Sequence, residues 1–268
     1  MVQRVRFVHA SDLHLDATLS GVDATDDRVI GALVRATFDA LDRVVEICIE
    51  READFLVIDK APGVHFHSQD GSAGVMAQLE RDLDLKLYSV HRLDTMTSGL
   101  LLFAKSSEAA AGFTQLFSEH KVQKYYVALA KGKPKKKQGS IVGDMAKSRR
   151  SMYKLLRSKE NPAITQFFSQ SVAEGLRLYL LKPLSGKTHQ LRVALASLGV
   201  PMLGDQLYGG EAADRGYLHA LALGFHWQGV DYHYVEMPSQ GELFTLDGVK
   251  NQLQTWNKPE KLDWPKRN

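Results

Sequence analysis

The stretch HRLDTMTSGLLLFAK, from His91 to Lys105, combines an acidic residue, a turn and an apolar run. Residues 100–104 are short, continuously apolar and bounded by turn residues, which predicts a buried strand. Asp94 precedes the turn at residues 97–99. Beside a buried strand a carboxylate is costly to ionise unless a cation pairs with it. We therefore expect Asp94 either to cap this turn or to take part in chemistry.

Two further blocks follow downstream. KYYVAL occupies residues 124–129, and SGKTHQLRVALASLGVPMLGDQLYG occupies residues 185–209. In order and separation, HRLDTMTSG and these two blocks resemble the motifs of the RluA-type pseudouridine synthases, from about residue 54 onward. The resemblance implies an isomerase that converts a specific uridine of tRNA or rRNA to pseudouridine.

The resemblance also assigns roles in catalysis. Asp94 matches the catalytic aspartate, as a nucleophile or as a base at the sugar, and both alternatives stay open. Such a carboxylate must stay ionised, and Arg192 is the expected partner that lowers its pKa. Tyr126 matches the tyrosine that stacks on the target base, while the neighbouring Tyr125 should point to the opposite face of a strand. Leu191 is expected to pack under the base.

RNA contacts are expected from neighbouring positions. A stacked uridine must be extruded to react. Arg92 matches the residue that fills the vacated stack, a task that suits a planar guanidinium. His91 is expected to fix the loop rather than to carry protons. Lys187 and His189 either contact phosphate or satisfy the turn before a helix, and the sequence leaves both interpretations open.

The charge of +3 is unevenly distributed along the chain. Residues 121–160 contain thirteen Lys or Arg and two acidic residues, so the rest of the chain is net acidic. The densest part, KGKPKKKQG at residues 131–139, is predicted to be a loop. Such a run is either a solvated surface or a site for phosphate backbones, and the implied RNA chemistry favours the second. The expected RNA-binding residues there are Lys133, Lys135, Lys136 and Lys137.

Composition restricts the other classes. Cys48 is the only cysteine, which excludes an intrachain disulfide and a Cys-rich zinc site and fits a reducing compartment. No apolar run reaches membrane-spanning length, and the first residues lack the apolar core of a secretory signal. We expect a cytoplasmic protein with no membrane association and no obligate protein partner. Isomerisation of uridine has no net redox change, so we expect no cofactor.

The first 53 residues differ from the rest. A strand is expected at residues 5–8 and a helix at residues 26–52, with Asp12 and His14 between them. This opening resembles the start of calcineurin-like metallophosphoesterases of the DNA-repair exonuclease type. The later ligand motifs of that family are missing, and one Asp with one His cannot hold two metals, so no metal site is predicted.

Lysine usage supports a junction near residue 54. Lys60 is the first lysine of the chain, and all six basic residues up to residue 58 are arginines. We therefore expect a truncated phosphoesterase-like arm at residues 1–53 and a synthase catalytic domain at residues 54–268. The arm occupies the place where the resemblance puts the synthase's own first strand, just before residue 55, so that strand is in doubt. Residues 44–50 could replace it, but their apolar spacing is helical.

Beyond residue 54 the expected elements are mixed. Helices are expected at residues 73–83, 107–119 and 189–198, and strands at residues 55–58, 100–103, 124–130, 165–171, 176–183, 218–225 and 232–236. Because strands outnumber helices without regular alternation, we expect an α+β fold with a mixed, largely antiparallel sheet. The resemblance implies that fold with flanking helices and a central cleft. We expect the short β-α arm of residues 1–53 to precede it.

Two other functions are considered beside the isomerase. An RNA-binding protein with an impaired site would bind RNA without releasing tritium from uridine labelled at C5. A metal-dependent phosphoesterase or nuclease would show hydrolysis that manganese stimulates and a chelator abolishes.

The basic loop gives a first testable prediction. Replacing Lys133, Lys135, Lys136 and Lys137 by Gln should weaken RNA binding and lower the slope of log Kd against log salt by up to about 4, since each phosphate contact contributes about one unit. The measurement is a salt titration of RNA affinity. An unchanged slope would mean that the loop faces only solvent.

Overall fold

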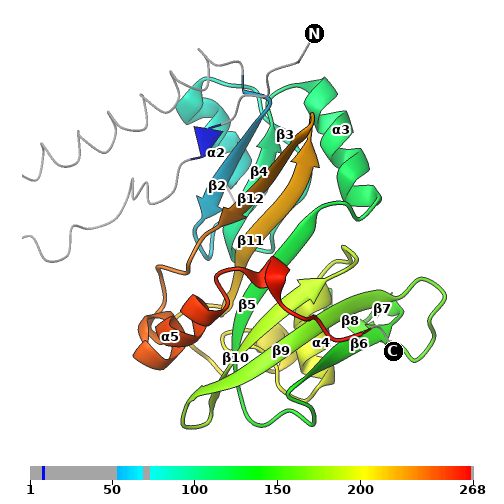
Figure 1. The fold of residues 1–268 in the computed structure, drawn as a ribbon, viewed down its shortest axis with the longest axis vertical. Coiled ribbons are helices and arrows are strands. Elements are labelled where there is room, and N and C mark those ends of the chain that lie inside the picture. The colour runs from blue at the N-terminus through cyan, green and yellow to red at the C-terminus, as the bar shows by residue number, and fades with distance from the viewer. Residues whose placement is uncertain (1–7, 10–52, 69–72, 267–268) are drawn as a thin grey trace, which may run out of the picture.

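The computed structural model describes residues 8–9, 53–68 and 73–266 (Figure 1). The strands in these ranges are β1 Val8–His9, β2 Phe55–Lys60, β3 Tyr88–Ser89, β4 Ser98–Ala104, β5 Gln123–Lys131, β6 Gln138–Gly143, β7 Met145–Lys147, β8 Tyr153–Leu155, β9 Ala163–Ala173, β10 Leu176–Pro183, β11 Leu218–Trp227 and β12 Val230–Val235. The helices are α2 Val75–Leu83, α3 Ser107–Ser118, α4 Gln190–Ser197 and α5 Asp247–Thr255, with 3-10 turns η1 Gln206–Tyr208, η2 Glu242–Thr245 and η3 Pro259–Lys261.

One sheet extends through the described part of the molecule. Its strand order is β1-β2-β4-β11-β5-β10-β9-β6, with β12 paired to β11 and β3 paired to β4. The pairs β1–β2 and β4–β11 are parallel, and the other pairs in this sheet are antiparallel. Figure 1 shows α2 and α3 at the β2–β4 end and α4 and α5 at the β5–β9 end. The expected α+β fold with a mixed, largely antiparallel sheet is confirmed.

Strand β4 forms the centre of one half of the core. All seven of its residues are buried. Leu100 and Leu102 pack on the side of α3 with Phe113, whereas Leu101 and Phe103 pack on the side of α2. A strand covered on both faces has no polar alternation, which is why the apolar run predicted it correctly.

Strand β5 connects the two halves of the molecule and separates its side chains between two faces. Tyr125, Val127 and Leu129 belong to the core cluster that includes α5. Ala128 and Ala130 belong to the opposite cluster with α4, and Tyr126 packs against its edge. This period of two places Tyr125 and Tyr126 on opposite faces, as the sequence predicts.

The ten helices and strands expected beyond residue 54 are present, with shifts of a few residues at their ends. Ser106 begins α3 because its hydroxyl accepts a hydrogen bond from Ala109 N–H at 3.1 Å. Strands β3, β6, β7 and β8 and helix α5 were not expected. Helix α5 was not expected because Val249 and Leu253 are its only buried residues, and two apolar positions do not make a recognisable helical pattern.

The predicted N-terminal arm is described only at Val8–His9. This strand pairs in parallel with β2, Val8 opposite Leu56 and His9 opposite Val57. The expected helix at residues 26–52, the alternative strand at 44–50, and Asp12 and His14 lie outside the described residues.

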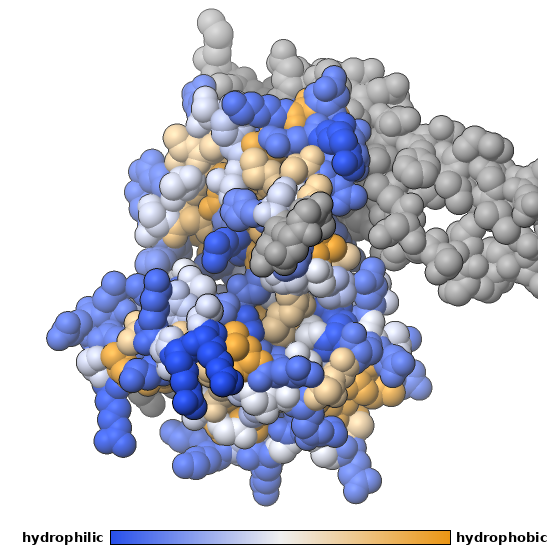
Figure 2. All heavy atoms as spheres, turned by 180° about the vertical axis from the view of Figure 1, so that it is seen from behind, coloured by the Kyte–Doolittle hydropathy of each residue, from blue (hydrophilic) through white to orange (hydrophobic). Residues whose placement is uncertain are grey.

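The described residues on the face shown in Figure 2 are mostly hydrophilic. Seen from behind in Figure 2, polar side chains project from both halves, and apolar surface is confined to small areas. Among the described residues, Val230, Val235 and Leu246 are the exposed large hydrophobic side chains. Within the same part of the chain, no helix has the length and apolar character needed to span a bilayer.

Gly99 determines how closely β4 approaches β11. Its φ is +100°, and a Cβ there would lie 2.4 Å from the carbonyl oxygen of Ala220. Gly99→Ala should therefore lower the free energy of unfolding by at least about 2 kcal/mol, through backbone strain plus a clash with main chain. Chemical denaturation measures the loss.

Gly175→Ala is the matched control. Gly175 also has a positive φ, +66°, but no heavy atom lies within 4 Å of the added Cβ. This variant should lose only the strain, about 1 kcal/mol. Equal losses in the two variants would contradict the close approach of β4 and β11.

Candidate active site

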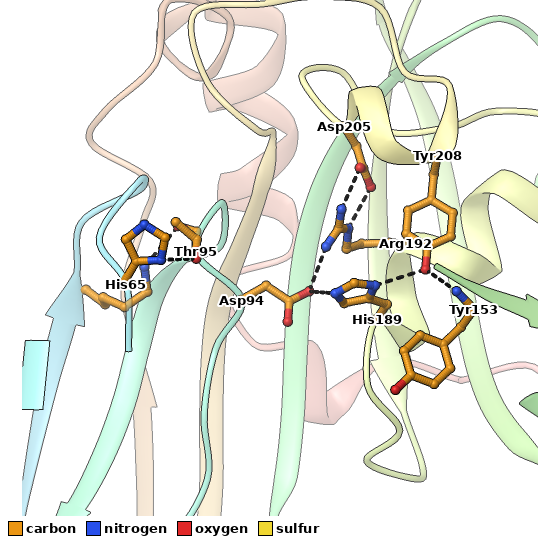
Figure 3. Close-up of polar contacts among 9 residues, drawn as sticks. His65, Asp94, Thr95, Tyr153, His189, Arg192, Asp205 and Tyr208 are labelled. Atoms are coloured by element: carbon orange, nitrogen blue, oxygen red, sulfur yellow. Dashed lines mark hydrogen bonds and ion pairs between the residues drawn. The ribbon is translucent and has the colours of Figure 1, made fainter. Parts of the chain in front are cut away.

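Asp94 lies in the loop between β3 and β4. Its main-chain carbonyl closes the turn by accepting Thr97 N–H at 2.9 Å. The carboxylate is therefore not the group that caps the turn. It points instead toward Arg192 on α4, and its side chain remains 24% exposed (Figure 3).

Arg192 is shared by two aspartates. Its Nη1 lies 3.3 Å from Asp94 Oδ2, while Nε and Nη2 donate to the two carboxylate oxygens of Asp205 at 2.8 and 2.7 Å. Asp205 is 1% exposed, so the bidentate ion pair of Arg192 with Asp205 is shielded from water. Burial alone would lower the pKa of Arg192, but its bonds and charge interactions with Asp205 and Asp94 raise it above the usual value. The guanidinium is thus a permanent cation held against Asp94.

His189 begins α4 in a left-handed conformation, with φ of +56°. Its Nε2 lies 4.0 Å from Asp94 Oδ2, and its Nδ1 lies 2.9 Å from the hydroxyl of Tyr208. That hydroxyl also accepts the backbone N–H of Tyr153 at 2.8 Å. Burial lowers the pKa of His189, and the charges of Arg192 and Arg92 lower it further against the opposing effect of the two aspartates. His189 is therefore neutral near pH 7.

A cleft of about 920 Å³ opens beside Asp94. Tyr126 and Leu191 line it together with Arg192, so an aromatic ring, an aliphatic side chain and a cation surround the carboxylate. Burial and the Asp94 charge raise the pKa of Tyr126, which keeps its phenol protonated. The cleft therefore offers an apolar slot with a single carboxylate at its wall.

A second hollow, of about 930 Å³, meets the first at the same carboxylate. Arg92, Asp94, His189 and Arg192 line both spaces. Asp94 is thus accessible from two sides, with the exposed Arg92 at the boundary.

His91 has structural contacts. Its Nε2 accepts Leu102 N–H at 2.9 Å, and its ring stacks on Phe117 with centroids 4.7 Å apart. Burial lowers the pKa of His91 to about 3, so the ring is neutral. These contacts fasten the Asp94 loop to β4 and favour the loop-fixing interpretation.

Most of the residues predicted from the sequence are brought together. The cleft lining includes His91, Arg92, Asp94, Tyr126, Lys187, His189, Leu191 and Arg192. The four lysines at residues 133, 135, 136 and 137 are exposed in the loop between β5 and β6, and none of them lines the cleft. Lys187 Nζ donates to Asn161 Oδ1 at 3.0 Å at the cleft wall.

Sequence reasoning missed three contributors to this site. Asp205 and Tyr208 belong to the GDQLY segment, which was noted without a role. Lys60 is 1% exposed and donates to the carbonyls of Ala61, Val64 and Thr95, the last at 3.3 Å. Burial and the nearby Arg215 charge lower the pKa of Lys60 to about 8. It anchors the residue next to Asp94.

Across the described ranges, no group of three or more His, Cys, Asp or Glu side chains is placed to hold a metal ion. The polar side chains that line both hollows with Asp94 are the guanidiniums of Arg92 and Arg192 and the imidazole of His189. The two cations suit an anionic substrate.

The pair of Arg192 with Asp205 generates a prediction. Asp205→Asn removes the buried charge that pairs with the guanidinium and should lower the free energy of unfolding by about 3 kcal/mol. The control is Glu211→Gln, because Glu211 pairs with Lys131 at 2.6 Å but is 59% exposed. That change should cost less than about 0.5 kcal/mol. Similar losses of unfolding free energy in both variants would show that the buried pair stabilises the fold no more than the exposed pair does.

Comparison with known proteins agrees with this geometry. The family model described as RNA pseudouridylate synthase matches residues 54–197. A Haemophilus influenzae protein named "Uncharacterized RNA pseudouridine synthase" is 47% identical over 211 residues, which cover 78% of this chain and 94% of the relative. Ribosomal large subunit pseudouridine synthase C of Yersinia pestis is 32% identical over 233 residues, covering 80% of this chain and 69% of the relative.

A solved structure is also similar. Human RNA Pseudouridylate Synthase Domain Containing 1 has a TM-score of 0.62 and 26% identity, and the match covers 80% of this chain and 94% of that one. The resemblance to the RluA-type enzymes is thereby supported by sequence and by fold. The chain belongs to the RNA pseudouridylate synthase family of isomerases.

Proposed function

We propose that the cleft converts a uridine of ribosomal or transfer RNA to pseudouridine, with Asp94 as the reacting carboxylate. The observation that carries the proposal is the position of this side chain. It stays 24% exposed while Arg192 Nη1 lies 3.3 Å from its Oδ2. A carboxylate that is both paired with a cation and open to a cleft is ready to act as an anion.

The reaction defines what the site must do. The bond from N1 to C1′ breaks, a bond from C5 to C1′ forms, the C5 proton leaves, and N1 takes up a proton. Atoms and electrons balance without an oxidant or reductant, so the proposed reaction needs no cofactor. Asp94 acts as a nucleophile or as a base at the sugar, and in either role it reacts as a carboxylate beside the Arg192 guanidinium.

The apolar part of the cleft holds the base. Tyr126 stacks on the everted uracil, and Leu191 packs beneath it, since both line the space that Asp94 faces. Enclosure of this kind keeps the detached base from leaving before C5 bonds to the sugar. The raised pKa keeps the phenol of Tyr126 protonated. The phenol can therefore relay a proton only if it releases its own proton as it accepts another.

The RNA strand is held by cations near the cleft. Arg92 is exposed where the two hollows meet and fills the position that the extruded base leaves. Lys187 at the cleft wall binds phosphate. The lysines of the β5–β6 loop extend this contact beyond the cleft. Phosphate contact by His189 remains a prediction, since both of its ring nitrogens already face protein groups.

Several broader assignments belong to the same proposal. The relative in Yersinia pestis is named for the ribosomal large subunit, which supports rRNA as the substrate class. A catalytic unit that starts at residue 54 is supported by the extent of the family match. A cytoplasmic location and a phosphoesterase-like arm at residues 1–53 remain predictions from the sequence.

Asp94→Asn tests the proposal directly. The substitution keeps the size of the side chain but removes its charge, so tritium release from RNA labelled at uridine C5 should fall at least about 1,000-fold. RNA affinity should stay within about threefold, because the cations that bind phosphate are unchanged.

The matched control is Asp231→Asn, the same change at an exposed residue of β12. This variant should release tritium at the wild-type rate. Turnover by Asp94→Asn at more than a tenth of the wild-type rate would overturn the assignment. If the wild-type protein neither releases tritium nor binds RNA, the proposed function is wrong.

A further inference from the structure

Strands β7 and β8 pair antiparallel as a hairpin, and a chain of polar contacts connects this hairpin to Asp94. The backbone N–H of Tyr153 in β8 donates to the hydroxyl of Tyr208 at 2.8 Å. That hydroxyl lies 2.9 Å from His189 Nδ1, and His189 Nε2 lies 4.0 Å from Asp94 Oδ2. Figure 3 shows the four groups in one line from hairpin to carboxylate. None of the roles derived above uses Tyr208.

The two ends of this chain fix the direction of its protons. A peptide N–H can only donate, and an ionised carboxylate can only accept. His189 is neutral because burial and the charges of Arg192 and Arg92 outweigh the opposing effect of Asp94 and Asp205 on its pKa. A neutral imidazole has one N–H, and the favourable place for it is Nε2, facing the carboxylate. Nδ1 then accepts, so the Tyr208 hydroxyl must donate to it.

The other tautomer is unfavourable in this setting. With the proton on Nδ1, the lone pair of Nε2 would face the Asp94 carboxylate across 4.0 Å. Tyr208 is well placed to prevent this, because the Tyr153 N–H occupies one of its lone pairs and leaves its own proton free for Nδ1. The Arg192 guanidinium also lies over the Tyr208 ring, 5.0 Å from its centroid, which holds the ring in place.

We propose that Tyr208 is a positioning residue for the reaction at Asp94: its hydroxyl fixes His189 in the tautomer that directs Nε2–H at the carboxylate, and it links that arrangement to the β7–β8 hairpin. The proposal rests on the assignment of Asp94 as the reacting group. It identifies His189 as a neutral imidazole whose Nε2–H faces the carboxylate across 4.0 Å, which is longer than a hydrogen bond, and not as a base.

The β7–β8 hairpin also carries exposed cations that could bind RNA. Its turn carries Arg149 and Arg150, both exposed, and Lys154 is exposed on β8. Lys147 at the end of β7 is exposed as well, and four cations on a short hairpin suit a phosphate backbone. Because β8 donates to Tyr208 through its main chain, an RNA strand held by the hairpin also holds the donor that orients Tyr208.

The first test reads the tautomer without any reaction. In the full chain labelled with ¹⁵N-histidine, the ring nitrogens of His189 should show a protonated Nε2 and an unprotonated Nδ1 at pH 7. In Tyr208→Phe, which keeps the ring over Arg192 but lacks the hydroxyl, His189 should give a mixture of tautomers. Tyr88→Phe, the same change on β3 outside the cleft lining, is the control and should leave the His189 signals unchanged.

The second test is kinetic. Single-turnover isomerisation by Tyr208→Phe should be slower by about tenfold, a cost typical of small misplacement of a reacting group, with RNA Kd changed less than about twofold. If Tyr208 acts through His189, Tyr208→Phe should cause no further loss in a His189→Gln background.

A wild-type His189 spectrum in Tyr208→Phe would overturn the proposal, and so would the same tenfold loss in both backgrounds. Both differ from failure of the proposed function, which would appear as retained turnover in Asp94→Asn. A variant that fails to fold is recognised by the loss of all native histidine signals. In that case the spectrum of the wild-type protein decides the matter, because a proton on Nδ1 of His189 contradicts the proposal by itself.

Discussion

A single buried guanidinium organises this site. Arg192 holds Asp205 with two hydrogen bonds and faces Asp94 with its remaining nitrogen. Its cost of burial is met by Asp205, which is shielded from water, so the side chain cannot swing to follow a substrate. Asp94 therefore has a fixed cation on one side and open space on the other. The proposed chemistry of the cleft depends on this asymmetry between one carboxylate that is fully paired and one that is only partly paired.

The sheet brings these groups together from distant parts of the sequence. Asp94 and Arg192 are 98 positions apart, and they meet because β4 and β11 pair in parallel while β5 and β10 continue the sheet to α4. Gly99 allows β4 to approach β11 directly behind the Asp94 turn. Lys60 fixes the adjacent carbonyl of Thr95, and His91 fastens the same loop to β4. The loop that carries the acid is thus held by several independent contacts.

The sequence predicted the buried parts of the fold well, because burial leaves a pattern. The apolar runs of β4 and β5 mark strands that are covered on both faces. Strand β6 contains two glycines, and β7 and β8 are three residues long, so none of them carries a clear alternation. Strand β6 forms against β9, and β7 and β8 form against each other. Helix α5 has two buried residues and a polar remainder, so its position depends on tertiary contacts that no local pattern records.

The site was predicted only partly, for a similar reason. Asp94, Tyr126 and Arg192 were identified through family motifs, since nothing in their spacing shows that they converge. Asp205 and Tyr208 were passed over because an Asp or Tyr in a loop has no pattern that marks it as buried or paired. Their importance follows from the bidentate pair and from the hydroxyl between two elements, which exist only in the folded chain.

The most direct test of the central claim is a crystal structure of the enzyme bound to an RNA stem-loop with 5-fluorouridine at the target position. Fluorine at C5 cannot leave as a proton, so the last step is blocked after the base has entered the cleft. The account predicts an everted ring between Tyr126 and Leu191, with its sugar C1′ within about 3.5 Å of Asp94. A base that stays stacked in the RNA, with Asp94 facing only solvent and Arg192, would contradict it.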